Sequence, residues 1–238
     1  MVLFGMAACS NESGSDDAEQ STGMAKIPLS DFPPLPSRGP GFWSEPLMGV
    51  CVVGVFSFML VGVTQSVAAA GMQAEAVADQ QDSYGTGDHS GRLLQIAVLL
   101  IWSEAGLAFF SLIYIVFGSA GVVRRSMTTC YPMPAEVEQR LLESKSLDGL
   151  RNVAGPQGSR TMGSYCVRCL VWRPPKDKSE PHHCNTCQRC VLGFDHHCGV
   201  FGRCIVRDNL LCFYTLIGML LAGMATTLVA VASSTADA

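Results

Sequence analysis

Charged residues are scarce in this chain: they make up only 15% of its 238 residues, whereas 48% are hydrophobic. A soluble domain of this size seldom carries so little charge, so the composition argues against an ordinary soluble protein and for membrane segments. The first ten residues also lack the basic start and the long apolar run of a secretory signal. We therefore expect no targeting signal there.

Three long stretches have almost no charge. Residues 47–71 and 210–232 contain none, and residues 93–123 contain only Glu104. Each stretch is long enough to cross a bilayer as a helix, which predicts a mainly α membrane protein with three transmembrane helices. Glu104 leaves two alternatives. If the second span begins near Ala105, this acid lies at the membrane interface, which is the simpler interpretation; if it begins at Leu93, Glu104 is an intramembrane acid and a functional candidate.

The segments around these helices are polar. Residues 1–46 are rich in Ser, Gly, Pro and acids, which predicts a disordered tail. Residues 72–92 read as a hydrophilic loop, with turn residues around 84–88. Residues 124–163 read as a linker with one short amphipathic helix, and residues 233–238 as a C-terminal tail.

The basic residues predict the orientation in the membrane. Residues 124–208 hold 13 of the 16 Lys and Arg but only eight Asp and Glu, a net charge of about +5. Arg124 and Arg125 directly follow the second apolar stretch. Because basic residues next to a span favour the cytosolic side, we expect this segment in the cytosol and the 72–92 loop in the lumen.

Cysteine and histidine gather in one short region. Seven of the eleven cysteines and four of the five histidines lie between Cys166 and Cys204. A Cys-x2-Cys pair puts two sulfurs on one tight turn, where both reach a single ion. Such pairs interleaved with histidines favour reduced, metal-bound thiols over disulfides. Residues 164–209 therefore read as a small zinc module whose folding depends on metal.

Nine of the thiol and imidazole groups in this region are ligand candidates, one more than two tetrahedral zinc sites need. They are Cys166, Cys169, His183, Cys184, Cys187, Cys190, His197, Cys198 and Cys204. A cysteine left outside a zinc site, next to a histidine and an aspartate, can act as a nucleophile. The sequence Asp195-His196-His197-Cys198 has this composition. A histidine beside a thiol favours the thiolate, and an aspartate orients the histidine.

Residues 164–209 resemble the DHHC cysteine-rich domain of the membrane protein S-acyltransferases, or palmitoyltransferases. The domain lies between the second and third transmembrane helices in this family, as the hydropathy places it here. The matching motifs are Cys166-x2-Cys169, Arg173-Pro174-Pro175, His183-Cys184-x2-Cys187-x2-Cys190, Phe194-Asp195-His196-His197-Cys198, Cys204-Ile205 and Asn209-x3-Phe213.

The resemblance implies two structural zinc ions, each bound by three cysteines and one histidine. Carried over by position, one set is Cys166, Cys169, His183 and Cys190, and the other is Cys184, Cys187, His197 and Cys204. On spacing we favour His183 over its neighbour His182 as the ligand.

The resemblance also implies a function. Cys198 stays free to take an acyl group from a long-chain acyl-CoA such as palmitoyl-CoA, with His196 as base and Asp195 orienting it. The acyl group then passes to a membrane-proximal cysteine of a protein substrate. The implied setting is the bilayer of the endoplasmic reticulum or Golgi, with the cysteine-rich domain facing the cytosol and no nucleic-acid partner.

The chain departs from the family pattern at several points. Gly199-Val200 stands where Pro-Trp is usual, and Arg203 where Asn is usual. The Asp-Pro-Gly motif is absent after the second span, and the fourth helix and the Thr-Thr-x-Glu motif are absent after the third. The chain thus reads as truncated after its third transmembrane helix. Two alternatives remain: a weakly active or inactive zinc-containing membrane adaptor of this family and, ranked lower on its different Cys-His spacing, a RING-type ubiquitin ligase.

Overall fold

The computed structural model describes residues 26–39, 44–81 and 89–236. The chain divides into two compact units, Met1–Phe32 and Pro33–Ala238. The described part of the first unit contains one short 3-10 helix, η1 (Leu29–Asp31). The turn predicted around residues 84–88 lies outside the described residues. The second unit holds all the remaining elements.

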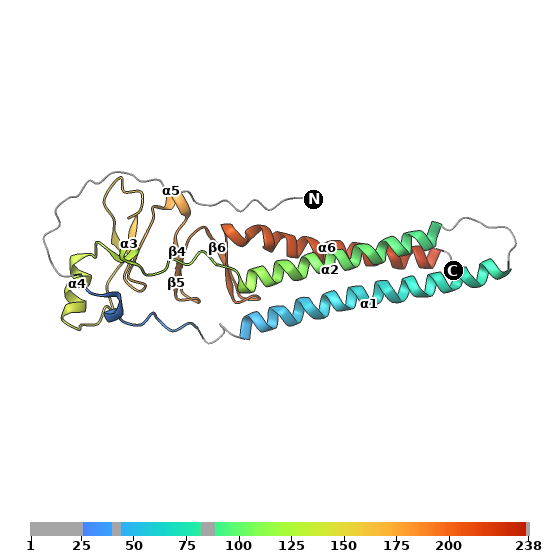
Figure 1. Ribbon diagram of the computed structural model, residues 1–238, viewed down its shortest axis with the longest axis horizontal. Coiled ribbons are helices and arrows are strands. Elements are labelled where there is room, and N and C mark those ends of the chain that lie inside the picture. Colours follow the sequence, from blue (N-terminus) through green and yellow to red (C-terminus); the bar gives the residue numbers. More distant parts are fainter. Residues whose placement is uncertain (1–25, 40–43, 82–88, 237–238) are drawn as a thin grey trace. The chain divides into compact units, whose positions relative to one another are not determined.

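Three long helices dominate the second unit: α1 (Ser44–Gln81), α2 (His89–Phe117) and α6 (Arg207–Ala236). They run side by side, and the strands gather at the end where α2 stops and α6 begins (Figure 1). Helix α2 packs most extensively against α6, and α1 contacts both. All three are long and apolar enough to cross a membrane, with mean hydropathies of 2.3, 2.1 and 2.0. The predicted fold class, a mainly α protein with three such helices, is confirmed.

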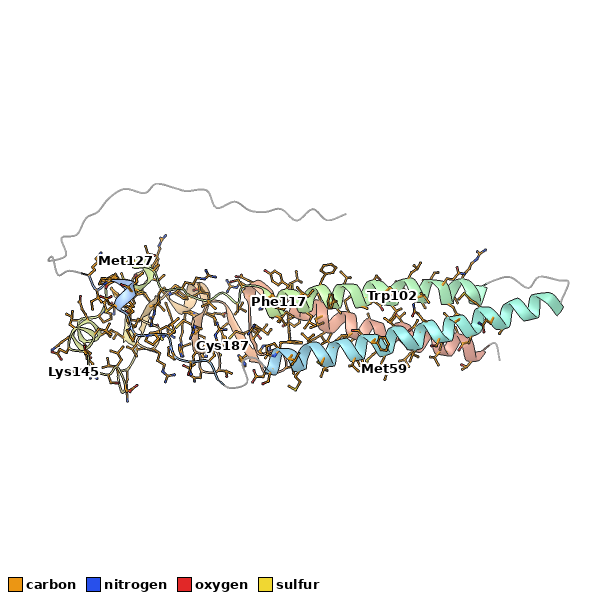
Figure 2. The ribbon with its side chains drawn as sticks, turned by 60° about the horizontal axis from the view of Figure 1, so that its bottom comes forward. Met59, Trp102, Phe117, Met127, Lys145 and Cys187 are labelled. Carbon is orange, nitrogen blue, oxygen red and sulfur yellow. The ribbon has the colours of Figure 1, made fainter. Side chains whose placement is uncertain are left out.

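The outer faces of these helices are apolar. Met59, Trp102 and Phe117 are labelled in Figure 2, and 60%, 56% and 80% of their surfaces are exposed. So many exposed large apolar side chains would be unfavourable in water but suit contact with lipid. Where the helices meet the strands, the buried side chains form what we call the helix-end cluster. Its members are Val53, Ala108, Leu112, Ile115, Val116, Phe201, Ile205 and Leu216.

Two hydroxyl-containing contacts join the helices inside the bundle. The hydroxyls of Thr64 and Thr227 are 3.0 Å apart, and the Thr226 hydroxyl donates to Glu104 Oε1 at 3.0 Å. Because α2 already begins at His89, Glu104 lies within the candidate span Gly91–Phe117 and not at its edge. The helix thus extends on both sides of Glu104, as in the second alternative, and its carboxylate contacts α6.

The linker after α2 is ordered by short elements. Val122 forms an isolated bridge with Val191, and helices α3 (Met127–Cys130) and α4 (Ala135–Leu142) follow. Helix α4 occupies the place of the predicted amphipathic helix and buries Val137 completely.

Seven short strands and one more helix make up the cysteine-rich region. Strands β1 (Val153–Ala154), β2 (Ser164–Cys166) and β3 (Val171–Arg173) form one antiparallel sheet. Helix α5 (Lys176–Ser179) leads to the hairpin of β4 (His182–Cys184) and β5 (Arg189–Val191). The last hairpin pairs β6 (Phe194–Cys198) with β7 (Arg203–Val206), which runs directly into α6.

Residues 33–39, whose composition predicted part of a disordered tail, lie along this region. The Arg125 and Arg189 guanidinium groups donate to the carbonyls of Pro33 at 2.6 Å and Pro36 at 2.9 Å. The backbone N–H of Gly39 donates to the carbonyl of Thr186 at 3.2 Å. Hydrogen bonds to its backbone thus hold this proline-rich segment against the cysteine-rich region, although it has few hydrophobic side chains to bury.

Candidate functional site: two metal centres and a free cysteine

Hairpin turns bring the cysteines together. The pair Cys166 and Cys169 occupies the β2–β3 turn, and Cys184 and Cys187 occupy the β4–β5 turn. Leu170 and Gln188, one residue after each pair, have φ angles of 57° and 52°. This left-handed conformation is unusual outside glycine and tightens both turns, so that each presents two thiols at one point.

Site one consists of Cys166, Cys169, His183 and Cys190, all buried. His183 and Cys190 face each other as partners across the β4–β5 hairpin. The Nδ1 atom of His183 lies 3.5 Å from the sulfur of Cys166, 3.3 Å from Cys169 and 3.7 Å from Cys190. His182 does not join this group: it is exposed and stacks on Phe194 at a centroid distance of 4.1 Å.

Site two consists of Cys184, Cys187, His197 and Cys204. Here too the histidine and the last cysteine, His197 and Cys204, are partners across a hairpin. The Nδ1 atom of His197 lies 3.5 Å from Cys184, 3.4 Å from Cys187 and 3.9 Å from Cys204. His183 and Cys184 serve different sites because consecutive strand residues point to opposite faces. The β4–β5 hairpin therefore connects the two sites.

The geometry of both sites fits a tetrahedral zinc ion. Zinc binds sulfur at about 2.3 Å and imidazole nitrogen at about 2.0–2.1 Å, which places S and N about 3.6 Å apart. The observed S–N distances, from 3.3 to 3.9 Å, bracket this value. In each group all four donor atoms lie within 4.8 Å of one another. Three cysteines and one histidine are also a typical structural zinc set.

The electrostatics of the donors also call for a cation. Hydrogen bonds from neighbouring thiols, chiefly Cys169 and Cys187, hold the pKa values of Cys166 and Cys184 far below the ordinary thiol value. The thiols of Cys166 and Cys169 raise the pKa of His183 to about 9, and Cys184 raises that of Cys187 to about 11. Three adjacent sulfurs cannot all ionise without a nearby positive charge, and a divalent ion supplies it.

Cys198 belongs to neither group. It lies at the end of β6 opposite Arg203, half-buried, and packs against the helix-end cluster. His196, two residues earlier on the same strand, shares its face because strand side chains alternate. The His196 ring meets Phe213 of α6 edge-on at a centroid distance of 5.3 Å, and its Nδ1 lies 2.7 Å from Asp195 Oδ1. The free thiol and a carboxylate-bound imidazole therefore both adjoin the helices.

Two side chains fix the last hairpin to the helices. The buried amide of Asn209 accepts from the N–H of Val206 at 2.8 Å and donates to the carbonyl of Cys204 at 3.1 Å. Arg203, where the family usually has Asn, donates from Nε to the carbonyl of Val116 at 2.9 Å. That carbonyl belongs to the last turn of α2, whose terminal C=O groups need donors. The hairpin that carries Cys198 is thus attached to both α2 and α6.

One residue near the site carries no signal in the sequence. Glu45, in the first turn of α1, places its Oε2 atom 3.5 Å from Nε2 of His197. A single acid at the start of an apolar stretch is common, and 152 positions separate the two residues. No spacing rule connects them.

The fold and the two Cys/His groups together define a class of protein: a helical membrane protein with two groups that could each hold a metal ion between its second and third long helices. A family model described as DHHC palmitoyltransferase matches residues 160–237. This region is thus similar to the DHHC palmitoyltransferase domain, and the resemblance inferred from the sequence is confirmed.

Individual relatives agree with this assignment. The "Probable protein S-acyltransferase 12" of Arabidopsis thaliana is 30% identical over 180 residues, which cover 73% of this chain and 55% of that protein. The "Palmitoyltransferase ZDHHC18-B" of Danio rerio is 39% identical over 53 residues, 22% of this chain and 13% of the relative. The "Palmitoyltransferase PFA3" of Debaryomyces hansenii is 53% identical over 32 residues, 13% of this chain and 7% of the relative. The chain thus spans about half the length, or less, of these relatives.

Proposed function

We propose that this chain is a membrane protein-cysteine S-acyltransferase in which Cys198 is the acyl carrier. The observation that supports the proposal is that neighbouring residues of β6 belong to different sites. His197 joins a metal group, whereas Cys198 stays outside both groups and packs on the apolar helix-end cluster. A thiol that is free, half-buried and adjacent to apolar helices suits the transfer of a fatty acyl chain.

In this proposal the eight donors of sites one and two bind two structural zinc ions. The chemistry that the ions would supply is charge: each would compensate the thiolates of its site and thereby contribute folding energy to the module. The ions take no part in acyl transfer. The protein's own residues carry out the steps that follow.

The first step loads the enzyme. His196 accepts the proton of the Cys198 thiol, and Asp195, 2.7 Å from Nδ1, stabilises the resulting imidazolium and fixes the ring. The Cys198 sulfur attacks the thioester carbonyl of an acyl-CoA. The new C–S bond to Cys198 forms, the bond to CoA breaks, and the CoA sulfur leaves with the proton that His196 held. Substrates with long acyl chains are favoured because the neighbouring surface is apolar.

The second step transfers the acyl group. The thiol of a cysteine on a protein substrate loses its proton to His196 and attacks the Cys198 thioester. The acyl group moves to that cysteine, and the Cys198 sulfur leaves and regains the proton. Because Cys198 adjoins the helix ends, accessible substrate cysteines are those close to the membrane surface. We propose that this surface faces the cytosol, on the basis of the basic residues after α2, in the endoplasmic reticulum or Golgi membrane that the family resemblance implies.

Covalent labelling tests this function. The full chain in membranes is incubated with a palmitoyl-CoA analogue that carries a clickable alkyne, and the label is checked for release by neutral hydroxylamine, which cleaves thioesters. We expect wild type and Cys212→Ser to be labelled, and Cys198→Ser to be unlabelled. Cys212 is a suitable control because it is also half-buried against the helix-end cluster. Equal labelling of Cys198→Ser and wild type would contradict the proposal, and an unlabelled wild type would favour the adaptor alternative.

A further inference from the structure

Site two differs from site one in what lies behind its histidine. In site one the outer nitrogen of His183, Nε2, is buried and meets no hydrogen-bond partner in the part of the chain that the structure describes. In site two the corresponding Nε2 of His197 lies 3.5 Å from Oε2 of Glu45. Both side chains are largely covered, with exposed fractions of 15% for His197 and 27% for Glu45. The sites thus have the same donors but different surroundings.

Glu45 is held in place by tight packing around the start of α1. Gly202, in the β6–β7 turn, has a φ of 57°, and any side chain there would collide with Pro46 and the Cβ of Glu45. Gly49, one helical turn further, has no room for a side chain against the Val200 carbonyl and the Phe201 ring. The first two turns of α1 therefore sit directly on the loop between Cys198 and Cys204. The position of the Glu45 carboxylate follows from this packing.

A third contact reaches the same site from the residues before α1. The carbonyl of Thr186, which lies between Cys184 and Cys187, accepts the N–H of Gly39 at 3.2 Å. Gly39, which precedes α1, thus contacts the turn that presents two thiols of site two. Helix α1 itself contacts the histidine of site two and the β6–β7 loop. In the described residues site one has no such carboxylate behind its histidine.

We propose that Glu45 is a positioning residue of site two that acts through His197. Its carboxylate accepts from the Nε2–H of His197, which leaves Nδ1 as the lone-pair nitrogen facing Cys184, Cys187 and Cys204. A carboxylate behind a metal-bound histidine fixes the tautomer and ring orientation and makes the nitrogen a stronger donor. Since His197 stands between His196 and Cys198 on β6, Glu45 also connects α1 to the strand that carries the free thiol. This inference rests on the zinc sites of the proposed function.

Zinc release provides a test that does not depend on activity. The full chain, purified with its zinc in detergent, is mixed with excess chelator, and release is followed by absorbance in wild type, Glu45→Ala and Glu45→Gln. We expect Glu45→Ala to release about half of its zinc about ten- to a hundredfold faster and the other half at the wild-type rate. Glu45→Gln should stay close to wild type, because its amide oxygen still accepts a hydrogen bond. Asp208→Ala is the matched control, since Asp208 is the exposed first-turn acid of α6.

Cadmium NMR identifies the affected site. With cadmium in place of zinc, wild type should give two resonances, and Glu45→Ala should shift only the one coupled to the ring of His197. Unchanged release and unchanged resonances in Glu45→Ala would overturn the role of Glu45, as would equal acceleration at both sites. A wild-type chain with a single metal ion would overturn the metal part of the proposed function itself. Two bound ions with no effect of Glu45→Ala would overturn only the role of Glu45.

Discussion

The imidazole of His196 meets the ring of Phe213 edge-on, with ring centroids 5.3 Å apart and an interplanar angle of 70°. This contact joins the strand that bears the proposed nucleophile to the first turns of α6. Phe213 also contacts Phe201, a member of the helix-end cluster, with ring centroids 6.4 Å apart. The orientation of the proposed base therefore depends on a residue of a membrane helix.

Phe213→Leu should slow the acylation of Cys198 without abolishing it. An aromatic pair of this kind contributes about 0.5–1.5 kcal/mol beyond its buried area, which corresponds to about a two- to tenfold loss in rate if it orients His196. The measurement is the initial rate of probe incorporation. Tyr214→Leu is the control. Tyr214 is the next residue along α6, its side chain is 60% exposed, and it makes no ring contact with His196 among the described residues. Equal rates for the two variants would contradict a role of Phe213 in orienting the base.

His196→Ala should cause a much larger loss. General-base assistance typically contributes about 10²–10⁴-fold, and the thiol of Cys198 would lose its proton acceptor. Asp195→Asn should lower the rate less than His196→Ala, because an amide can still hold the ring but stabilises an imidazolium poorly. Single-turnover acylation rates check this order. A rate for Asp195→Asn below that of His196→Ala would show that Asp195 acts in some other way.

Replacing one proposed metal ligand should remove one zinc ion and unfold the local module. For site one we choose Cys190→Ser, since Cys190 is completely buried beside the other two thiols. Zinc analysis should give one ion per chain in place of two, and limited proteolysis should cut within residues 164–206. Cys51→Ser, at an exposed cysteine of α1, should retain both ions. Two retained ions in Cys190→Ser would exclude Cys190 as a ligand.

Thr226→Val should destabilise the helix bundle, and a second substitution should restore it. The Thr226 hydroxyl is the partner of Glu104 Oε1, while Oε2 is buried without a partner among the described residues. Removing the hydroxyl leaves the acid unpaired and should cost about 1–3 kcal/mol. Glu104→Leu combined with Thr226→Val replaces both partners and should recover most of that loss. Unfolding in detergent measures all variants, and additive losses in the double variant would contradict the pairing.

The sequence predicts those parts of the fold that local rules determine. Long apolar stretches specify spanning helices, and Cys-x2-Cys spacings specify hairpin turns that present two thiols together. The strand alternation that separates His197 from Cys198 also follows from the sequence, because it depends on neighbouring positions alone.

Contacts between distant segments could not be predicted in this way. Glu45 meets His197 across 152 positions, and Arg203 meets Val116 across 87. Such pairs depend on how α1 and α2 pack against the last hairpin, which no periodicity encodes. The partner of Glu104 could not be predicted for the same reason. An acid raises the cost of a membrane helix locally, but the interhelical partner Thr226 offsets that cost and lies on another helix.

In the proposed enzyme, eight donors bind two metal ions and leave the sulfur of Cys198 to carry the acyl group. Tandem mass spectrometry of the zinc-loaded chain after brief exposure to palmitoyl-CoA, combined with zinc analysis of the same sample, tests this arrangement. We expect two zinc ions per chain and a thioester-linked palmitoyl group on Cys198. An acyl group on one of the six cysteines of sites one and two, with Cys198 unmodified, would contradict it.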